Sequence, residues 1–424
     1  MAETASTADG PVTPRGLGRS YGDAAIGAEG GVVVLSERLD RFIDFDESSG
    51  TLIAEGGVSF RRILECFTRR GWFLPVTPGT QFVTLGGAIA CDVHGKNHHA
   101  DGSIGRFIDW VDLLLPSGET ARCSRHDDPD LFRATVGGMG LTGIIVAAAI
   151  RLMPVPSAFV KTQTAKAKDL DGTLDLFEQR FNEHRYSVAW IDGLARGRRL
   201  GRGVLMGGDH ATEPDLQLMA KPAQRADRFR IPELRQRPVP FDFPSFTLNP
   251  LTVAMFNAAY SITRRSGVAL EPLRQFFYPL DAVHGWNRVY GKRGFQQYQF
   301  VIPFEAGRDG LRELMGRLAA SKRASFLTVL KTLGEQGEGY LSFPRPGWTL
   351  TLDLPSAPGL TELLRSLDER VIELGGRRYL AKDASLTRES FERMYPDLDA
   401  FRSVRERVDP NRRLDSALAR RLGL

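Results

Sequence analysis

The hydrophobic and polar positions of the chain follow two patterns, one before and one after residue 157. In the first part, short apolar runs between glycine-rich turns predict strands over residues 32–35, 50–57, 107–115 and 143–153. Helical spacing predicts helices over 60–70 and 128–135. Pro154 and Pro156 then interrupt the pattern, so we place the first domain boundary between residues 157 and 158.

Beyond this boundary, strands with alternating polar and apolar residues lie between longer helices. The pattern predicts helices over 169–185, 360–374 and 387–394, and strands over 187–192, 297–302, 326–331, 348–354 and 377–382. If the strands 297–302, 326–331 and 348–354 are neighbours, one face of the sheet presents polar side chains to a cavity, namely Gln297, Gln299, Lys331 and Thr351. The alternative is a half-solvated antiparallel sheet, which is the commoner use of such alternation.

Length, composition and charge narrow the class of protein. A chain of 424 residues exceeds one ordinary core, so two domains are expected. No apolar run reaches the length of a membrane helix, and the N-terminal MAETASTADG lacks the features of a signal peptide. The cysteines form no disulfide framework, and we expect reduced thiols at Cys66, Cys91 and Cys123.

The net charge of +5 permits attraction to an anionic membrane or a phosphate-bearing substrate, but it is too weak and scattered to indicate nucleic-acid binding. We therefore expect a cytoplasmic protein. The alternatives are a peripheral position at the inner face of the membrane, or export without a recognisable signal.

Three glycine-rich stretches stand out, namely RGLGRSYGD at 15–23, VTPGTQFVTLGGAIACDVHGKNHH at 76–99 and GGMGLTG at 137–143. Glycine lets a ligand approach the backbone, and successive free N–H groups form an anion-binding concavity. A lone Gly-Gly more often marks a tight turn before a buried strand, but three such loops predict a cofactor cradle. The first loop is one residue longer than the dinucleotide fingerprint, and no phosphate-loop motif is visible.

The histidines of the second loop suggest a metal site at first sight. Gly95 and Asn97 disfavour the helix that would place His94 and His98 at ligand spacing, and no cysteine or carboxylate cluster accompanies them. We therefore predict no metal.

Several segments together carry a family resemblance, namely RGLGRSYGD, PGTQFVTLGGAIACDVHGKNHH, ATVGGMGLTGII, FQQYQFVIP and YLAKD. They resemble flavoproteins of the vanillyl-alcohol-oxidase type, and among these the FAD-dependent oxidase subunits of decaprenylphosphoryl-ribose 2′-epimerase. The resemblance runs from about Pro11 to the C-terminus. It implies an α+β fold with a PCMH-like FAD-binding domain over residues 1–157, an antiparallel-sheet substrate domain over 158–375, and a C-terminal segment over 376–424 that returns to the FAD-binding domain.

Family members place a strand–helix unit before the RGLGRSYGD loop, whereas this sequence starts almost at the loop. Either the true start lies upstream, or the flavin half lacks one layer and is less stable than usual.

The resemblance implies FAD as the cofactor. Related flavoenzymes often attach the ring to a histidine in the first loop, but Arg19-Ser20-Tyr21 offers no such nucleophile, so we predict non-covalent FAD. The residues that the resemblance assigns to the cofactor are Arg15, Gly16, Leu17, Gly18, Arg19, Ser20, Tyr21, Gly22, Asp23, Gly79, Thr84, Leu85, Gly86, Gly87, Cys91, His94, Gly140, Ile145 and Tyr379.

Lys382 is the residue that we predict to act as the catalytic base or hydroxyl anchor, because a lysine desolvated beside a flavin has a lowered pKa. Tyr21, His94 and Gln299 are expected to orient the sugar. The predicted substrate contacts are Lys96, Gln297, Gln299, Lys331, Thr349 and Thr351. Many family members carry a cysteine at the position of Thr351 and an asparagine at that of Thr349. Reactions that need that thiol are therefore expected to fail, whereas alcohol oxidation is not.

The activity that the resemblance implies is oxidation of the 2′-hydroxyl of decaprenylphosphoryl-ribose to a 2′-keto sugar. This is the first half of epimerisation to decaprenylphosphoryl-arabinose, an arabinan precursor of cell wall biosynthesis. A separate NAD(P)H-dependent short-chain reductase would be the partner that completes it. The alternatives are an oxidase of another sugar or alditol, and a flavin-free subunit that binds a lipid-linked sugar.

The stretch from 213 to 265 is the least regular part of the sequence, with many prolines and arginines before an aromatic stretch that contains Phe241, Phe243, Phe246, Phe256 and Tyr260. One interpretation is a mobile surface loop followed by a packed helix. The other is a lid or membrane-contact element, with basic residues near phosphate and apolar ones near a lipid tail.

Overall fold

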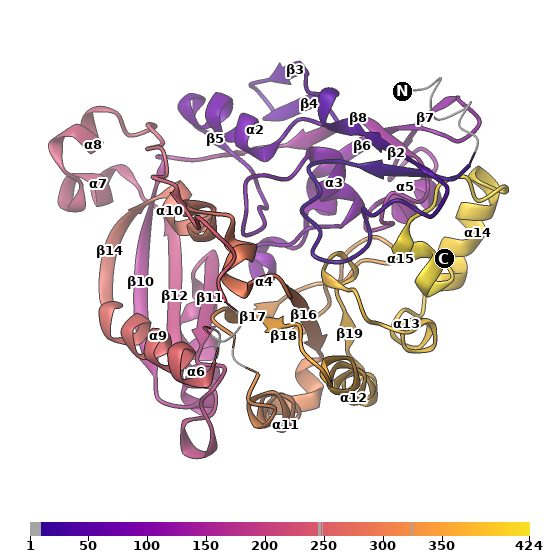
Figure 1. Ribbon diagram of the computed structural model, residues 1–424. Helices are drawn as coiled ribbons and strands as arrows, with labels where there is room; N and C mark the ends of the chain where they lie inside the picture. Colours follow the sequence, from indigo (N-terminus) through magenta and orange to yellow (C-terminus); the bar gives the residue numbers. More distant parts are fainter. Residues whose placement is uncertain (1–9, 245–246, 248, 324) are drawn as a thin grey trace.

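Two antiparallel sheets dominate the computed structural model, which describes residues 10–244, 247, 249–323 and 325–424. The N-terminal residues 1–9 and Phe246 lie outside the described residues. A five-stranded sheet lies at the top of Figure 1, and an eight-stranded sheet curves along the left and the bottom. The mixture of helices and antiparallel sheets confirms the predicted α+β class.

The five-stranded sheet is built from the first part of the chain, in the order β3 (Phe42–Asp46), β4 (Thr51–Glu55), β8 (Ile144–Arg151), β6 (Ile108–Leu114) and β7 (Thr120–Ser124). Its companions are the β5 (Trp72–Phe73) and β9 (Met153–Pro154) pair and the helices α2 (Phe60–Phe67), α3 (Leu85–Ala90), α4 (His98–Asp101) and α5 (Pro129–Thr135). Helix α2 begins at Ser59, whose side chain accepts a hydrogen bond from the Arg62 N–H. The apolar face of α2 is buried, as its helical spacing predicts.

The first described strand lies beside the C-terminal segment of the chain, which is yellow in Figure 1. Strand β1 (Val12–Arg15) pairs in parallel with β2 (Val32–Leu35). On the other side of β1, the Val12 N–H donates to the Arg413 carbonyl at 2.6 Å, and the Asp415 N–H donates to the Val12 carbonyl at 3.0 Å. The C-terminal helices are α13 (Arg388–Met394), α14 (Leu398–Val408) and α15 (Ala417–Leu422). The first glycine loop therefore follows a strand that is held by both ends of the chain.

The eight-stranded sheet has the order β14 (Gly267–Pro272), β10 (Phe159–Ala167), β12 (Gly203–His210), β11 (Tyr186–Ile191), β17 (Thr328–Leu333), β18 (Gly347–Pro355), β16 (Phe295–Ile302) and β19 (Arg377–Arg378). The strands predicted from alternation over 297–302, 326–331 and 348–354 are thus confirmed as neighbours. Along the outer side of this sheet lie α6 (Leu170–Gln179), α11 (Gly307–Ala320) and α12 (Leu360–Glu373) (Figure 1). The opposite side of the sheet is left to face the first part of the chain.

The irregular region between β12 and β16 holds α7 (Glu213–Met219), α8 (Pro222–Ala226), α9 (Pro250–Thr263), α10 (Leu273–Phe277) and the short pair β13 (Arg237–Pro238) and β15 (Val283–His284). Helix α9 starts at Asn249, whose side chain accepts from the N–H groups of Leu251 and Thr252. Among the described residues, no helix is long and apolar enough to cross a membrane.

Two predicted elements are shorter than their sequence patterns indicate. The helix expected over 169–185 ends at Gln179, and a short turn at Phe181–Glu183 leads into β11. The strand expected over 377–382 ends at Arg378 and becomes a 3-10 turn over Leu380–Lys382. The side chain of Arg378 is held by ion pairs with the buried carboxylates of Asp368 and Asp383. The turn carries Lys382 away from the sheet edge and onto the wall of a cavity.

Candidate active site

A cavity of about 1320 Å³ lies between the two sheets. Residues from all three glycine-rich loops line it, including Gly18, Gly86 and Gly140, together with Tyr379 and Lys382 from the C-terminal segment. Its volume exceeds the range of about 300–1,000 Å³ that is common for small-molecule sites. The predicted convergence of the three loops is therefore what the structure shows, with room for a large cofactor and a second ligand.

The first loop presents unpaired backbone donors to the cavity. Among the described residues, the backbone N–H groups from Leu17 to Ser20 donate no hydrogen bond, and all of these residues border the cavity. Gly18 has φ +60°, in the left-handed region that allows successive N–H groups to converge. Such a run of free donors suits a phosphate-bearing group.

The first loop also packs directly against the start of α3. A Cβ at Gly16 would lie 2.3 Å from the Thr84 Oγ1, so only glycine permits this approach. Thr84 itself caps α3 by accepting from the Gly87 N–H at 3.1 Å. The Gly-Gly of the second loop therefore begins a helix, and the alternative of a turn into a buried strand is wrong.

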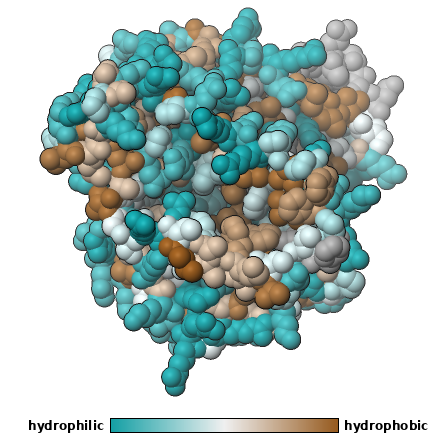
Figure 2. Space-filling model, turned by 60° about the vertical axis from the view of Figure 1, so that its left-hand side comes forward, coloured by the Kyte–Doolittle hydropathy of each residue, from teal (hydrophilic) through white to brown (hydrophobic). Residues whose placement is uncertain are grey.

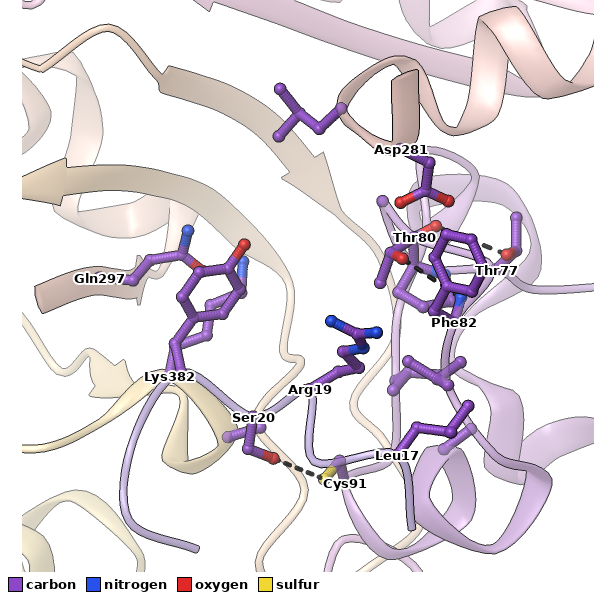
Figure 3. Close-up of a pocket in the computed structure, with 18 of the residues that line it drawn as sticks. Leu17, Arg19, Ser20, Thr77, Thr80, Phe82, Cys91, Asp281, Gln297 and Lys382 are labelled. Carbon is purple, nitrogen blue, oxygen red and sulfur yellow. Dashed lines mark hydrogen bonds between the residues drawn. The ribbon is translucent and has the colours of Figure 1, made fainter. Parts of the chain in front are cut away.

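Figure 3 shows the walls of the cavity. Gln297 and Lys382 lie on one side, Thr80, Phe82 and Asp281 lie on the other, and Arg19 reaches into the space between them. Most predicted cofactor residues line this space, namely Arg15, Gly16, Leu17, Gly18, Arg19, Ser20, Tyr21, Gly79, Thr84, Gly86, Gly87, Cys91, His94, Gly140, Ile145 and Tyr379.

Three of the predicted cofactor residues do not reach the cavity. Gly22 packs against the C-terminal segment, where an added Cβ would lie 1.6 Å from the Asp383 carbonyl oxygen. Asp23 forms an ion pair with Arg421 at 2.8 Å. Leu85 is fully buried in the core beneath α3. These residues shape the first and second loops and do not border the ligand space.

Gln299 and Thr349, which we predicted to contact the sugar, lie behind His94 instead. The amide nitrogen of Gln299 donates to His94 Nε2 at 2.9 Å and to Thr349 Oγ1 at 3.1 Å. Neither residue lines the cavity. Both are buried, and the ring of His94 lies between Gln299 and the cavity. Of the predicted substrate contacts, Lys96, Gln297, Lys331 and Thr351 do line it.

His94 is a neutral ring in this environment. Burial, reinforced by the positive charge of Lys331, lowers its pKa well below the ordinary value. With Nε2 accepting from the Gln299 amide, the ring proton lies on Nδ1. Among the described residues, Nδ1 has no hydrogen-bond partner. The His94 ring lines the cavity, and its Nδ1 is a buried donor without a partner among these residues.

Three lysines reach the cavity deep in the molecule. Burial lowers the pKa of Lys382 to about 8 and that of Lys96 to about 8. The pKa of Lys331 falls to about 7, through burial and then through repulsion by the other two ammonium groups. Lys96 donates to the Phe276 carbonyl at 2.5 Å, and Lys331 donates to the Gly95 carbonyl at 3.3 Å. The three amines are therefore placed to exchange protons near neutral pH or to hold an anion.

A buried carboxylate that we did not predict lies behind Gln297. Asp353 accepts from the Gln297 amide at 2.5 Å and from the Tyr290 hydroxyl at 3.1 Å. Burial raises the pKa of Asp353, and the charge of Lys382 opposes that shift. The sequence did carry a signal, because Asp353 lies two residues beyond Thr351 on the same face of the strand. Gln297 is thereby fixed with its own carbonyl oxygen unpaired among the described residues.

Asp281 is the second residue that the sequence analysis missed. It lines the wall opposite Lys382, and its carboxylate accepts from the Gln81 N–H at 3.0 Å (Figure 3). Burial raises its pKa, while the charge of Arg19 opposes that shift. It belongs to a short turn in the irregular region, where no periodic pattern marks a functional position.

The residues present fit an FAD molecule. The free N–H groups after Arg15 suit a pyrophosphate, and the space beside Gly79 is open, because a Cβ added there would meet nothing within 4 Å. The unpaired donor of His94 and the unpaired acceptor of Gln297 are available to a polar ring system or a sugar. The Cys91 thiol, 3.9 Å from the Ser20 hydroxyl, stays protonated because burial raises its pKa to about 11.

Comparison with known proteins agrees with this site. Residues 1–124 match the model of an FAD binding domain, and residues 356–422 match that of D-arabinono-1,4-lactone oxidase. The fold and the site thus define an FAD-dependent oxidoreductase of the vanillyl-alcohol-oxidase type with a PCMH-like FAD-binding fold.

The relatives narrow the class further. The chain is 39% identical to the decaprenylphosphoryl-beta-D-ribose oxidase of Mycolicibacterium smegmatis, over 97% of this chain and 89% of that protein. A Streptomyces coelicolor protein, named only as an uncharacterized protein in the mprA 5′ region, is 38% identical over 87% of this chain and its own full length. The glycolate oxidase subunit GlcD of Bacillus subtilis is 26% identical over 38% of this chain and 35% of its own. The chain belongs to the decaprenylphosphoryl-beta-D-ribose oxidase family.

Proposed function

We propose that this protein oxidises the 2′-hydroxyl of decaprenylphosphoryl-ribose to the 2′-keto sugar, as the first half of epimerisation to the arabinose form. The observation that carries the proposal is the position of Lys382, which shares one cavity with the glycine loops of the FAD-binding domain and with Gln297. FAD, when bound there, supplies the acceptor for a hydride from the carbinol carbon.

The protein's part in the reaction is to take a proton and to orient the sugar. Neutral Lys382 accepts the hydroxyl proton at Nζ while the C–H bond of the same carbon breaks and its hydride leaves. His94 Nδ1–H and the carbonyl oxygen of Gln297 are free to hold sugar oxygens, and Tyr21 borders the same space. This division of roles needs no thiol, which is consistent with a threonine at position 351.

The substrate phosphate would lie at Lys331 and Lys96. Both amines border the cavity and have lowered pKa values, and the single negative charge of a bound phosphodiester would favour their charged forms. The keto product retains an oxidised carbon that must be reduced to complete epimerisation. An NAD(P)H-dependent short-chain reductase is therefore the class of partner that the reaction requires.

An absorption spectrum and a substrate titration test the proposal. Purified protein should show the flavin bands, release FAD on denaturation, and lose its visible absorbance when prenylphosphoryl-ribose is added without oxygen. Free ribose and an alditol serve as comparison substrates. Bleaching by the alditol but not by the prenylphosphoryl sugar would support an oxidase of another polyol instead. Colourless protein that does not bind added FAD would support a flavin-free subunit.

A further inference from the structure

Helix α9 exposes an unbroken apolar face. From Asn249 to Thr263 the chain carries no charged residue. Leu251, Met255 and Ile262 are exposed at 69%, 64% and 75%. Their spacing of four and seven residues places them on one side of the helix. Figure 2 brings forward the side of the molecule that carries α9 in Figure 1, and it shows hydrophobic residues gathered beside a hollow in the surface.

The opposite side of α9 forms part of the cavity wall. Phe256 and Tyr260 line the cavity, and the Tyr260 ring lies 4.6 Å from that of Trp190 on β11. Asn257 is buried and donates to Asp192 at 2.7 Å, which anchors the helix to the sheet. One helix thus separates the ligand space from an exposed apolar surface.

The cavity beneath α9 is suited to a hydrocarbon. The side chains of Val188, Trp190, Met206, Phe326 and Val329 line it there, and Arg264 against Tyr260 is the charged group beside them. This part of the cavity is distant in sequence from the glycine loops and lies over β11, β12 and β17. A prenyl chain attached to a sugar phosphate at the lysines has an apolar path along the inner side of α9.

Positive charge adjoins this apolar face. Exposed Arg265 follows the helix directly, whereas Arg264 lines the cavity with its guanidinium 5.4 Å from the centre of the Tyr260 ring. A helix of 14 residues is too short to span a bilayer. An exposed apolar helix face that ends at an exposed arginine is suited to the interface of an anionic membrane.

We propose that α9 lies in the surface of an anionic lipid bilayer, with Leu251, Met255 and Ile262 among the acyl chains, and admits the prenyl chain of the substrate along its inner side. The part concerning the prenyl chain rests on the proposed function, whereas the part concerning membrane binding does not.

Co-sedimentation with vesicles tests the membrane contact. The wild type should bind vesicles of phosphatidylcholine with about 30% phosphatidylglycerol more tightly than vesicles of phosphatidylcholine alone. A variant with Leu251→Gln, Met255→Gln and Ile262→Gln should bind the anionic vesicles at least about tenfold more weakly. Leu218→Gln is the control, because Leu218 is 86% exposed on α7 and should leave binding unchanged. Ala258→Glu, which adds one charge to exposed α9 surface, should weaken binding in the same direction.

Turnover separates the two parts of the proposal. The triple variant should oxidise a short, water-soluble prenylphosphoryl-ribose at the wild-type rate, but should lose at least about tenfold in kcat/KM for the long-chain substrate held in vesicles. Retained flavin content and circular dichroism would show that the variant is folded.

Unchanged vesicle binding in both α9 variants would overturn the proposal. The proposal would also be overturned if the triple variant bound vesicles normally but formed a smaller oligomer than the wild type. The apolar face of α9 would then be a contact between copies of the chain. If the wild type oxidises neither substrate, the proposed function fails, and the vesicle result alone still decides the membrane contact.

Discussion

The amide nitrogen of Gln299 lies 2.9 Å from Nε2 of His94 and fixes which nitrogen of that ring carries the proton. Gln299 is in turn held by Thr349, which donates its own proton to the Phe300 carbonyl at 2.8 Å. The chain Thr349–Gln299–His94 therefore ends in an Nδ1–H that is buried and has no partner among the described residues. Gln299 acts as a positioning residue in this arrangement.

Replacing Gln299 should lower turnover without loss of cofactor. Gln299→Glu keeps the size of the side chain but offers an acceptor to His94, so the proton moves to Nε2 and the donor at Nδ1 is lost. We expect kcat to fall about 10- to 100-fold, the loss that is typical when a residue orienting a metal-binding histidine is replaced. Steady-state kinetics with flavin content checks this. Gln217→Glu on exposed α7 is the control, and a normal kcat in Gln299→Glu would remove the positioning role.

Lys382→Ala should abolish most turnover while the protein stays yellow. Loss of a general base costs about 10²- to 10⁴-fold. Because burial lowers the pKa of Lys382 to about 8, the neutral amine accumulates as the pH rises through 8. The kcat of the wild type should therefore rise about tenfold per unit below pH 8 and level off above it. Lys166→Ala at the exposed end of β10 is the control. If kcat of Lys382→Ala still rises with pH up to about pH 8, the group that titrates there is not Lys382.

Lys331→Met should raise KM and leave kcat nearly unchanged. If the ammonium holds the substrate phosphate, its removal weakens the binding of the substrate and of the transition state equally. KM then rises while kcat stays the same. The sign of the pH effect is opposite to that of Lys382, since the protonated form binds phosphate and the pKa of free Lys331 is lowered to about 7. KM of the wild type should thus increase as the pH rises above 7, and this increase should flatten in the variant. A fall in kcat with an unchanged KM would contradict the assignment.

Arg378→Met should destabilise the fold strongly. The guanidinium is fully buried and pairs with Asp368 at 2.8 Å and Asp383 at 3.1 Å. Removing one partner of a buried ion pair leaves uncompensated charge and costs about 3–5 kcal/mol. Urea unfolding measures the change in the free energy of unfolding. The control is Arg308→Met, whose exposed ion pairs with Asp175 and Glu178 should contribute less than about 1 kcal/mol. Equal effects of the two variants would show that the buried network adds nothing.

Thr351→Cys should create a thiol that bound substrate protects from chemical labelling. Position 351 lines the cavity, so a maleimide should label the new cysteine more slowly when prenylphosphoryl-ribose is saturating. Cys66 is exposed and should be removed first by Cys66→Ser, whereas Cys91 is a protonated thiol and Cys123 is buried. Mass spectrometry counts the labels. Labelling that is indifferent to the substrate would place the sugar elsewhere in the cavity.

Much of this site could be predicted from local patterns. Alternation along 297–302 and 348–354 identified a polar face, because the period of a strand fixes which side chains share a side. It could not show that His94, from a loop about 200 residues earlier, would cover Gln299 and Thr349. Asp281 was missed for a similar reason, and the pattern could not decide whether Phe256 and Tyr260 belong to a packed surface helix or to a lid. Their positions depend on how an irregular segment packs over the sheet, and no local period records such packing.

Strand β1 is completed by a residue that is synthesised much later than the strand itself. Thr13 donates to the Asp415 carbonyl across 402 positions of the chain. At about 5–20 residues per second, a ribosome needs about 20–80 s to synthesise the stretch between them. During that time the segment leading into the first glycine loop lacks its neighbour, so the nascent chain cannot close the nucleotide cradle. The cradle can therefore close only after the segment around Asp415 has been synthesised.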